Sequence, residues 1–83
     1  MNKAAQKISD IVGWYGVVAI TLAYLLLNFG LFSRENLTYQ FLNFSGALGI
    51  IMISLFKKAY QPAVLNIIWA AVALIAMLGI AFF

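Results

Sequence analysis

An apolar run of about twenty residues, from Leu37 to Phe56, occupies the middle of the chain. Its length is that of a helix crossing the hydrocarbon core of a bilayer, which needs roughly 20 residues. Apolar runs of similar length precede and follow it, at residues 11–32 and 60–83. The sequence therefore predicts three membrane-spanning segments, with the middle one packed against both of its neighbours.

The composition leads to the same fold class. The chain is 66% hydrophobic and 8% charged, whereas a soluble domain is about 45–50% apolar and about 25% charged. A small domain leaves much of its surface wet, so water could not be the solvent for so much apolar surface. In hydrocarbon every backbone N–H and C=O needs an internal partner, and a chain this short cannot close a barrel. We expect an all-α membrane protein, a bundle of three transmembrane helices in a single domain over residues 1–83.

Several classes of chemistry are excluded by what the chain lacks. It contains no cysteine and no histidine, which removes disulfides, thiol catalysis, haem, iron–sulfur clusters and most zinc sites. The only acidic side chains, Asp10 and Glu35, lie at the ends of apolar runs, so no titratable acid or base is placed for general acid–base work or proton coupling within the membrane. The net charge of +3 is too small and scattered for a nucleic-acid surface. We predict a protein that is not an enzyme and has no metal, cofactor or nucleic-acid partner.

The ends of the runs carry capping and turn signals. Residues 1–10 are expected to form a polar tail, with Ser9 or Asp10 capping the first helix. The run that follows is too long for a signal-peptide core, which indicates an uncleaved first span. Ser33 or Asn36 is expected to cap the second helix, and Pro62 suits the first turn of the third.

Basic residues predict the orientation of the chain. Lys3, Lys7, Lys57 and Lys58 share one side of a three-span protein, and Arg34 stands alone on the other. By the positive-inside rule, the N-terminus lies in the cytoplasm and the C-terminus outside. Because all copies then insert the same way, any homodimer would be parallel, with three helices from each copy.

Two spans carry stripes at helical spacing. On the first span, steps of three and four residues align a partly polar stripe that should face protein or water rather than lipid: Trp14, Val17, Thr21, Tyr24 and Asn28. The third span has a seam of small residues, which let helices approach closely in lipid: Ala59, Ala63, Asn66, Ala70 and Ala73. That seam is one candidate for a dimer interface. The residues we expect to pack helices are Gly46, Gly49, Ala63, Ala70 and Ala73.

Each span also carries one asparagine: Asn28, Asn43 and Asn66. The structural interpretation is that these amides bond between helices, with Asn28 and Asn43 pairing across the first hairpin. The functional interpretation is that Asn66, with the Trp69 ring three residues on, holds a small neutral polar solute. A third possibility is that Asn66 pairs across a dimer interface while Trp69 packs against lipid. The candidate solute-binding residues are Asn66, Trp69, Tyr24, Asn28, Asn43 and Gln40.

Nearly the whole chain resembles a family of short, uncharacterised bacterial proteins with three spans, which implies residence in the inner membrane but no known function. The stretches that carry this resemblance are Gly13-Trp14-Tyr15-Gly16, Ala23-Tyr24-Leu25-Leu26, Tyr39–Ala47 and Val64–Trp69.

The three-span layout is also similar to that of the SemiSWEET transporters of the PQ-loop superfamily. Those are parallel homodimers with a substrate site between protomers, and Asn66 sits close to where they carry a sugar-binding Asn after a Pro. Their Pro-Gln pair in the first span is replaced here by residues 23–28, and their late second-span Trp by Ile50 and Ile51.

Two functional hypotheses follow. The first is uncoupled transport of a small neutral polar solute across a homodimer. The second is a non-transporting accessory subunit or lipid-interacting scaffold of a membrane complex. A polar void lined by Asn66 from two copies would favour the first hypothesis, and continuous close packing the second.

Overall fold

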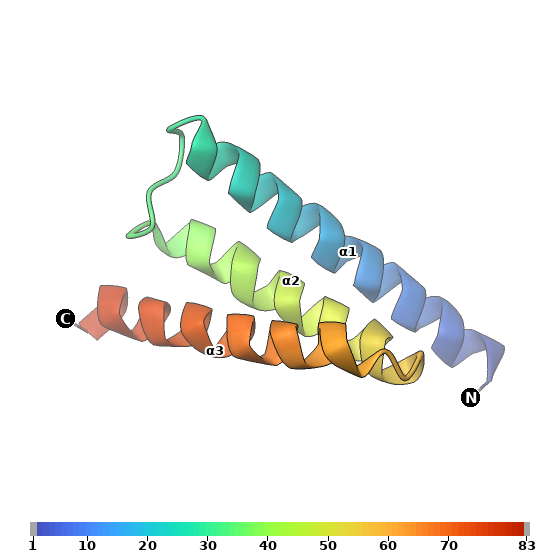
Figure 1. Ribbon diagram of the computed structural model, residues 1–83. Helices are drawn as coiled ribbons and strands as arrows, with labels where there is room; N and C mark the ends of the chain where they lie inside the picture. Colours follow the sequence, from blue (N-terminus) through green and yellow to red (C-terminus); the bar gives the residue numbers. More distant parts are fainter. Residues whose placement is uncertain (1, 83) are drawn as a thin grey trace.

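The computed structural model describes residues 2–82, which form three helices: α1 (Lys3–Asn28), α2 (Leu37–Phe56) and α3 (Tyr60–Phe82) (Figure 1). All three helices are long and apolar enough to cross a membrane. The longest dimension of the protein is 43 Å, close to the thickness of about 40–45 Å of a bilayer with its headgroups. The predicted all-α, multi-pass class is confirmed.

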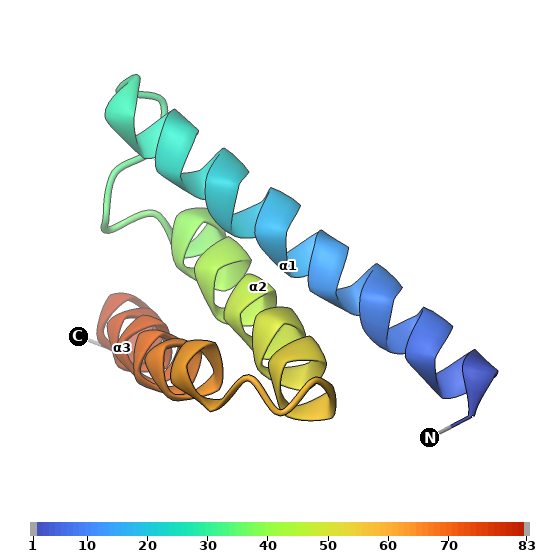
Figure 2. The ribbon, with the colours of Figure 1, turned by 45° about the vertical axis from the view of Figure 1, so that its right-hand side comes forward.

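Helix α2 is the centre of the fold. It packs against α1 on one side and α3 on another, while α1 and α3 make no contact with each other within the described residues. Figure 2 shows α2 lying between the two outer helices. The three helices therefore form an open layer, rather than a closed bundle in which each packs against the other two.

Helix α1 begins earlier than expected. The side-chain oxygen of Asn2 accepts a hydrogen bond of 2.7 Å from the backbone N–H of Ala5, and the helix begins at Lys3. The predicted cap at Ser9 or Asp10 is therefore wrong. The intervening residues are mostly Lys, Ala and Gln, which are strong helix formers and extend α1 out of the apolar run.

Both connections are short and locally specified. After α1, Gly30 adopts a left-handed φ of +79°, and the Leu31 N–H reaches back to the Leu26 carbonyl at 2.9 Å, a pattern that ends many helices. After α2, Lys58 takes the corresponding left-handed position with a φ of +56°. Asn36 caps α2 through the N–H of Tyr39 at 3.1 Å, one of the two predicted caps.

The antiparallel course of the helices sorts the basic residues by end. The N-terminal end of α1 and the connection at 57–59 lie at one end, and the connection at 29–36 and the C-terminal end of α3 lie at the other (Figure 1). Lys3, Lys7, Lys57 and Lys58 therefore gather at the first end, called the lysine end below, and Arg34 is at the second.

Burial follows a pattern suited to lipid. The buried side chains are small, while bulky ones such as Phe41 and Ile75 point outward. Among the described residues, the largest side chain that is fully buried is that of Ser9. Small residues at the contacts let helices approach closely where no hydrophobic effect drives them together.

Glycines on both helices form the contact between α1 and α2. A methyl group added to Gly16 would overlap the carbonyl oxygen of Gly46, and one added to Gly49 would lie 2.5 Å from the carbonyl oxygen of Val12. The two backbones therefore touch without an intervening side chain. The Tyr15 hydroxyl and Ser45 Oγ, 2.7 Å apart, add a hydrogen bond between the same helices.

The small-residue seam of α3 is buried inside the chain. Ala63, Asn66, Ala70 and Ala73 are the buried residues of α3, and α2 is the helix that α3 contacts. The seam is occupied by α2, so its predicted use as a dimer interface is wrong. The residue pattern indicated a close helix contact but not which helix would make it.

We predict that Gly16→Ala destabilises the fold by about 1–3 kcal/mol, because the new methyl group meets the fixed backbone of α2. Gly79→Ala is the matched control, because nothing lies within 4 Å of an added methyl group there. The free energy of unfolding, measured in mixed detergent micelles, should fall for the first variant and stay equal or rise for the second. Equal effects of both substitutions would contradict the packing described.

Candidate functional site

The three asparagines use their amide groups in the same way. Each Nδ2 donates to the carbonyl oxygen four residues earlier: Asn28 to Tyr24 at 2.8 Å, Asn43 to Tyr39 at 3.2 Å and Asn66 to Pro62 at 2.9 Å. Such bonds tie one N–H of each amide to its own helix. Asn28 is exposed and Asn43 is buried, and the predicted pairing of these two residues across the first hairpin is wrong.

Trp69 contacts Asn43 instead of Asn66. The indole Nε1–H of Trp69 donates to Asn43 Oδ1 at 3.5 Å, a long hydrogen bond between α3 and α2. Asn43 is only 5% exposed, whereas Trp69 is half exposed. The two residues expected to hold a solute together, Asn66 and Trp69, therefore have separate partners.

The partly polar stripe of α1 is uncovered. Tyr24 is 64% exposed and Trp14 69% exposed, and Thr21 and Asn28 are exposed as well. The face of α1 that packs on α2 is a different stripe of small residues, which we did not identify from the sequence: Ser9, Gly13, Gly16, Ala19 and Ala23. Its steps of three and four residues are a packing signal present in the sequence, on a different face from the polar side chains.

One stripe of α2 connects the two outer helices. Steps of three and four residues align Asn43, Gly46, Ile50, Ile53 and Lys57 along it. At one end Lys57 pairs with Asp10 of α1, and toward the other end Asn43 bonds Trp69 of α3. Gly46, Ile50 and Ile53 of this stripe lie against α1. The stripe therefore marks the side of α2 on which α1 and α3 leave a face open between them, which we call the open side.

The polar stripe of α1 borders the open side. Asp10 lies one helical turn before Trp14 and continues that stripe toward the lysine end. A shallow pocket of about 180 Å³ there includes Trp14 and Val17 together with Ile53 of α2 and Lys57, which follows the last residue of α2. Four of the six predicted solute residues thus border one face: Tyr24, Asn28, Asn43 and Trp69. Asn66 lies buried between α3 and α2, and Gln40 donates to the Arg34 carbonyl at 2.8 Å in the first connection.

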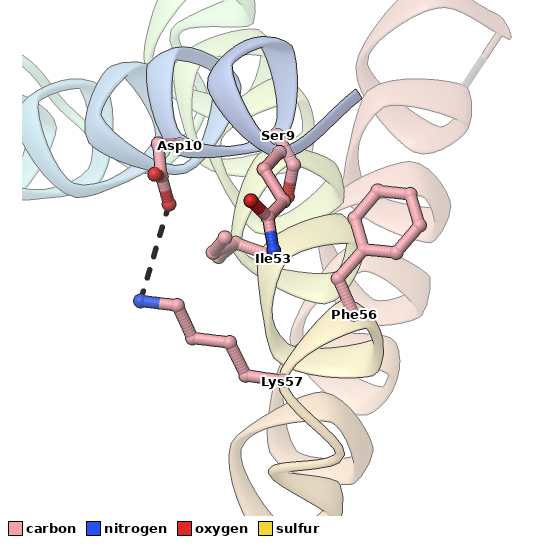
Figure 3. Close-up of a pocket in the computed structure, with 6 residues that line it drawn as sticks. Ser9, Asp10, Ile53, Phe56 and Lys57 are labelled. Atoms are coloured by element: carbon pink, nitrogen blue, oxygen red, sulfur yellow. Dashed lines mark ion pairs between the residues drawn. The ribbon is translucent and has the colours of Figure 1, made fainter. Parts of the chain in front are cut away.

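A cavity of about 270 Å³ lies between α1 and α2 at the lysine end (Figure 3). The Asp10 carboxylate and the Lys57 ammonium face each other there at 3.9 Å, both largely exposed. Ser9, which lines the same cavity, is 0% exposed, and its Oγ has no hydrogen-bond partner. The lining residues are Gln6, Ser9, Asp10, Ile53, Phe56 and Lys57.

Three long apolar helices, tight small-residue contacts and bulky side chains directed outward define a multi-pass membrane protein. A sequence model of an uncharacterised protein family matches residues 9–82, and the chain belongs to that family. No curated protein and no solved structure matches the chain. The comparisons therefore give no support to the resemblance to SemiSWEET and PQ-loop transporters.

The contact between Asn43 and Trp69 can be measured by a double-mutant cycle with Asn43→Ala and Trp69→Phe. Interhelical hydrogen bonds in membranes contribute about 0.6 kcal/mol on average, and we expect a coupling free energy of this size. The matched cycle with Asn66→Ala and Trp69→Phe should give a coupling near zero. A larger coupling in the second cycle would show that Asn66, and not Asn43, is the partner of Trp69.

Proposed function

We propose that the protein is a non-transporting, non-catalytic scaffold or accessory subunit of the bacterial inner membrane, which works by binding a further transmembrane helix on its open side. The observation that supports this proposal is the uncovered polar stripe of α1. A solute-binding site is supported less well, because each of the three asparagine amides already donates a hydrogen bond within its own helix.

The stripe has a physical need for a partner. Among residues 2–82, the Tyr24 hydroxyl has no hydrogen-bond partner, although its side chain is 64% exposed at membrane depth. A hydroxyl without a partner in an apolar medium costs about 1–3 kcal/mol by mutational measures. Polar side chains on membrane spans accordingly face other helices or water-filled cavities rather than acyl chains.

A second copy of this chain is the partner we propose. The excess of lysines at one end orients every copy in the same way, so two copies meet as parallel molecules. A two-fold axis beside α1 brings identical stripes together. Thr21, Tyr24 and Asn28 then offer donors and acceptors to their counterparts, and the dimer holds six spans with the N-termini in the cytoplasm.

Transport remains a second candidate, favoured by a specific feature of the open side. Tyr24, Asn28, Asn43 and Trp69 border it without any charged group at membrane depth, and a facing copy would enclose these uncharged polar groups. In proteoliposomes, solute uptake that exceeds protein-free controls and is lost in Tyr24→Phe and Asn28→Ala would favour transport over the scaffold role. Uptake equal to the protein-free controls is the result we expect.

The dimer is tested by disulfide cross-linking, for which a chain without native cysteine is well suited. Thr21→Cys places a thiol on the polar stripe, and Leu22→Cys places one on the adjacent exposed aliphatic face. We expect oxidation in native membranes to give a covalent dimer with the first variant and little with the second. Equal cross-linking of both variants, or none with Thr21→Cys, would contradict the proposed interface.

A further inference from the structure

We propose that the cavity at the lysine end binds the phosphoethanolamine headgroup of a zwitterionic phospholipid. The site lies between α1 and α2 at the lysine end and shares Asp10, Ile53 and Lys57 with the open side. The residues proposed for the dimer contact, Thr21, Tyr24 and Asn28, lie farther along α1, so headgroup binding does not depend on the dimer. Figure 3 shows Asp10 and Lys57 on opposite sides of the opening, with Ser9, Ile53 and Phe56 beside them.

The buried hydroxyl of Ser9 is the first reason to expect a ligand. Its Oγ is inaccessible and has no hydrogen-bond partner, although Ser9 lines a cavity of about 270 Å³. Buried polar groups are nearly always satisfied by protein, water or a ligand, so an unpaired hydroxyl beside a cavity needs an explanation. Because Oγ is inaccessible in this structure, a ligand oxygen accepts the Ser9 O–H only when the cavity wall opens around it.

The charges at the opening indicate the kind of ligand. Asp10 Oδ1 and Lys57 Nζ are 3.9 Å apart, at the loose limit of an ion pair, and both side chains are more than half exposed. Such surface pairs contribute little by themselves, so each group remains available to a ligand. One carboxylate and one ammonium together match a ligand that carries one ammonium and one anionic group.

The position of the cavity selects a lipid as the source of those groups. It lies where α1 leaves the apolar run and α2 ends, at the level of a headgroup layer. Its apolar wall, Ile53 and Phe56, continues onto the lipid-facing surface of α2. A phosphate can therefore approach Lys57 and Ser9 while the ethanolamine ammonium donates to Asp10, and the acyl chains remain in the bilayer.

The same chemistry discriminates among lipids. A choline headgroup has no N–H to donate to Asp10, and a glycerol headgroup has no cation to offset the Asp10 carboxylate. We therefore expect phosphatidylethanolamine to bind more tightly than phosphatidylcholine or phosphatidylglycerol. A surface that only gathers anionic lipid through its lysines would rank phosphatidylglycerol first.

The test is native mass spectrometry of the purified full chain with the three lipids added at equal concentration. Lys57→Gln should lower phosphatidylethanolamine binding by about fivefold, the factor expected for one lysine–headgroup attraction. Lys58→Gln is the matched control. It removes the same charge from the next residue, whose side chain does not line the cavity. Ser9→Ala should also lower binding.

The carboxylate is tested in the same way. Asp10→Asn should abolish the preference for phosphatidylethanolamine over phosphatidylcholine, whereas Glu35→Gln, the same change at the opposite end, should preserve it. Soluble glycerophosphoethanolamine in excess should displace the lipid while binding more weakly than the lipid does.

Several results would overturn the proposal. They are equal binding of the three lipids, phosphatidylglycerol ranked first, or equal effects of Lys57→Gln and Lys58→Gln. Failure of glycerophosphoethanolamine to compete would show that the acyl chains alone direct binding. Soluble headgroup that binds as tightly as the intact lipid would assign the site to a free small molecule instead.

Discussion

The backbone contact between α1 and α2 is the interaction on which the rest of the structure depends. Gly16 and Gly46 meet without an intervening side chain, which brings Tyr15 within hydrogen-bond distance of Ser45 and Asp10 within reach of Lys57. The cavity at the lysine end exists because these two helices are held so close there. If a side chain separated the helices, both polar contacts and the cavity would be lost together.

Helix α2 can serve two neighbours because its contact residues are small. Gly46 and Gly49 face α1, whereas the seam of α3, which includes Ala63 and Ala70, is buried against α2. The outer helices have no such second face and make no contact with each other among the described residues. One side of the molecule is therefore left open, bordered by the polar stripe of α1, and this asymmetry is the basis of the proposed dimer.

Much of the fold followed from the sequence, because the relevant signals are local. The length of the apolar runs, the cap at Asn36 and the turn position of Pro62 depend on a few neighbouring residues. The start of α1 was not predicted correctly. The expected cap was Ser9 or Asp10, but the good helix formers before them extend the helix to Asn2, which caps it. Periodicity identified the seam of α3 but could not say whether its partner was α2 or a second copy.

The candidate site was harder to predict, because it depends on which group each polar side chain bonds in the folded protein. An asparagine amide in a helix always has a carbonyl four residues earlier within reach, and all three asparagines use it. Sequence spacing placed Trp69 beside Asn66 on one helix, but the packing of α2 on α3 brings its indole to Asn43. The cavity beside Ser9 had no local signal, since it arises where the ends of two helices meet.

The order of the helices, with α2 between two outer helices that do not touch, is tested most directly by NMR of selectively labelled protein in lipid nanodiscs. Through-space contacts should connect Gly16 with Gly46 and Trp69 with Asn43, and none should connect α1 with α3 of the same chain. Samples that mix differently labelled copies separate contacts within a chain from contacts between chains. Contacts between α1 and α3 within one chain, or no contact between Gly16 and Gly46, would contradict this arrangement.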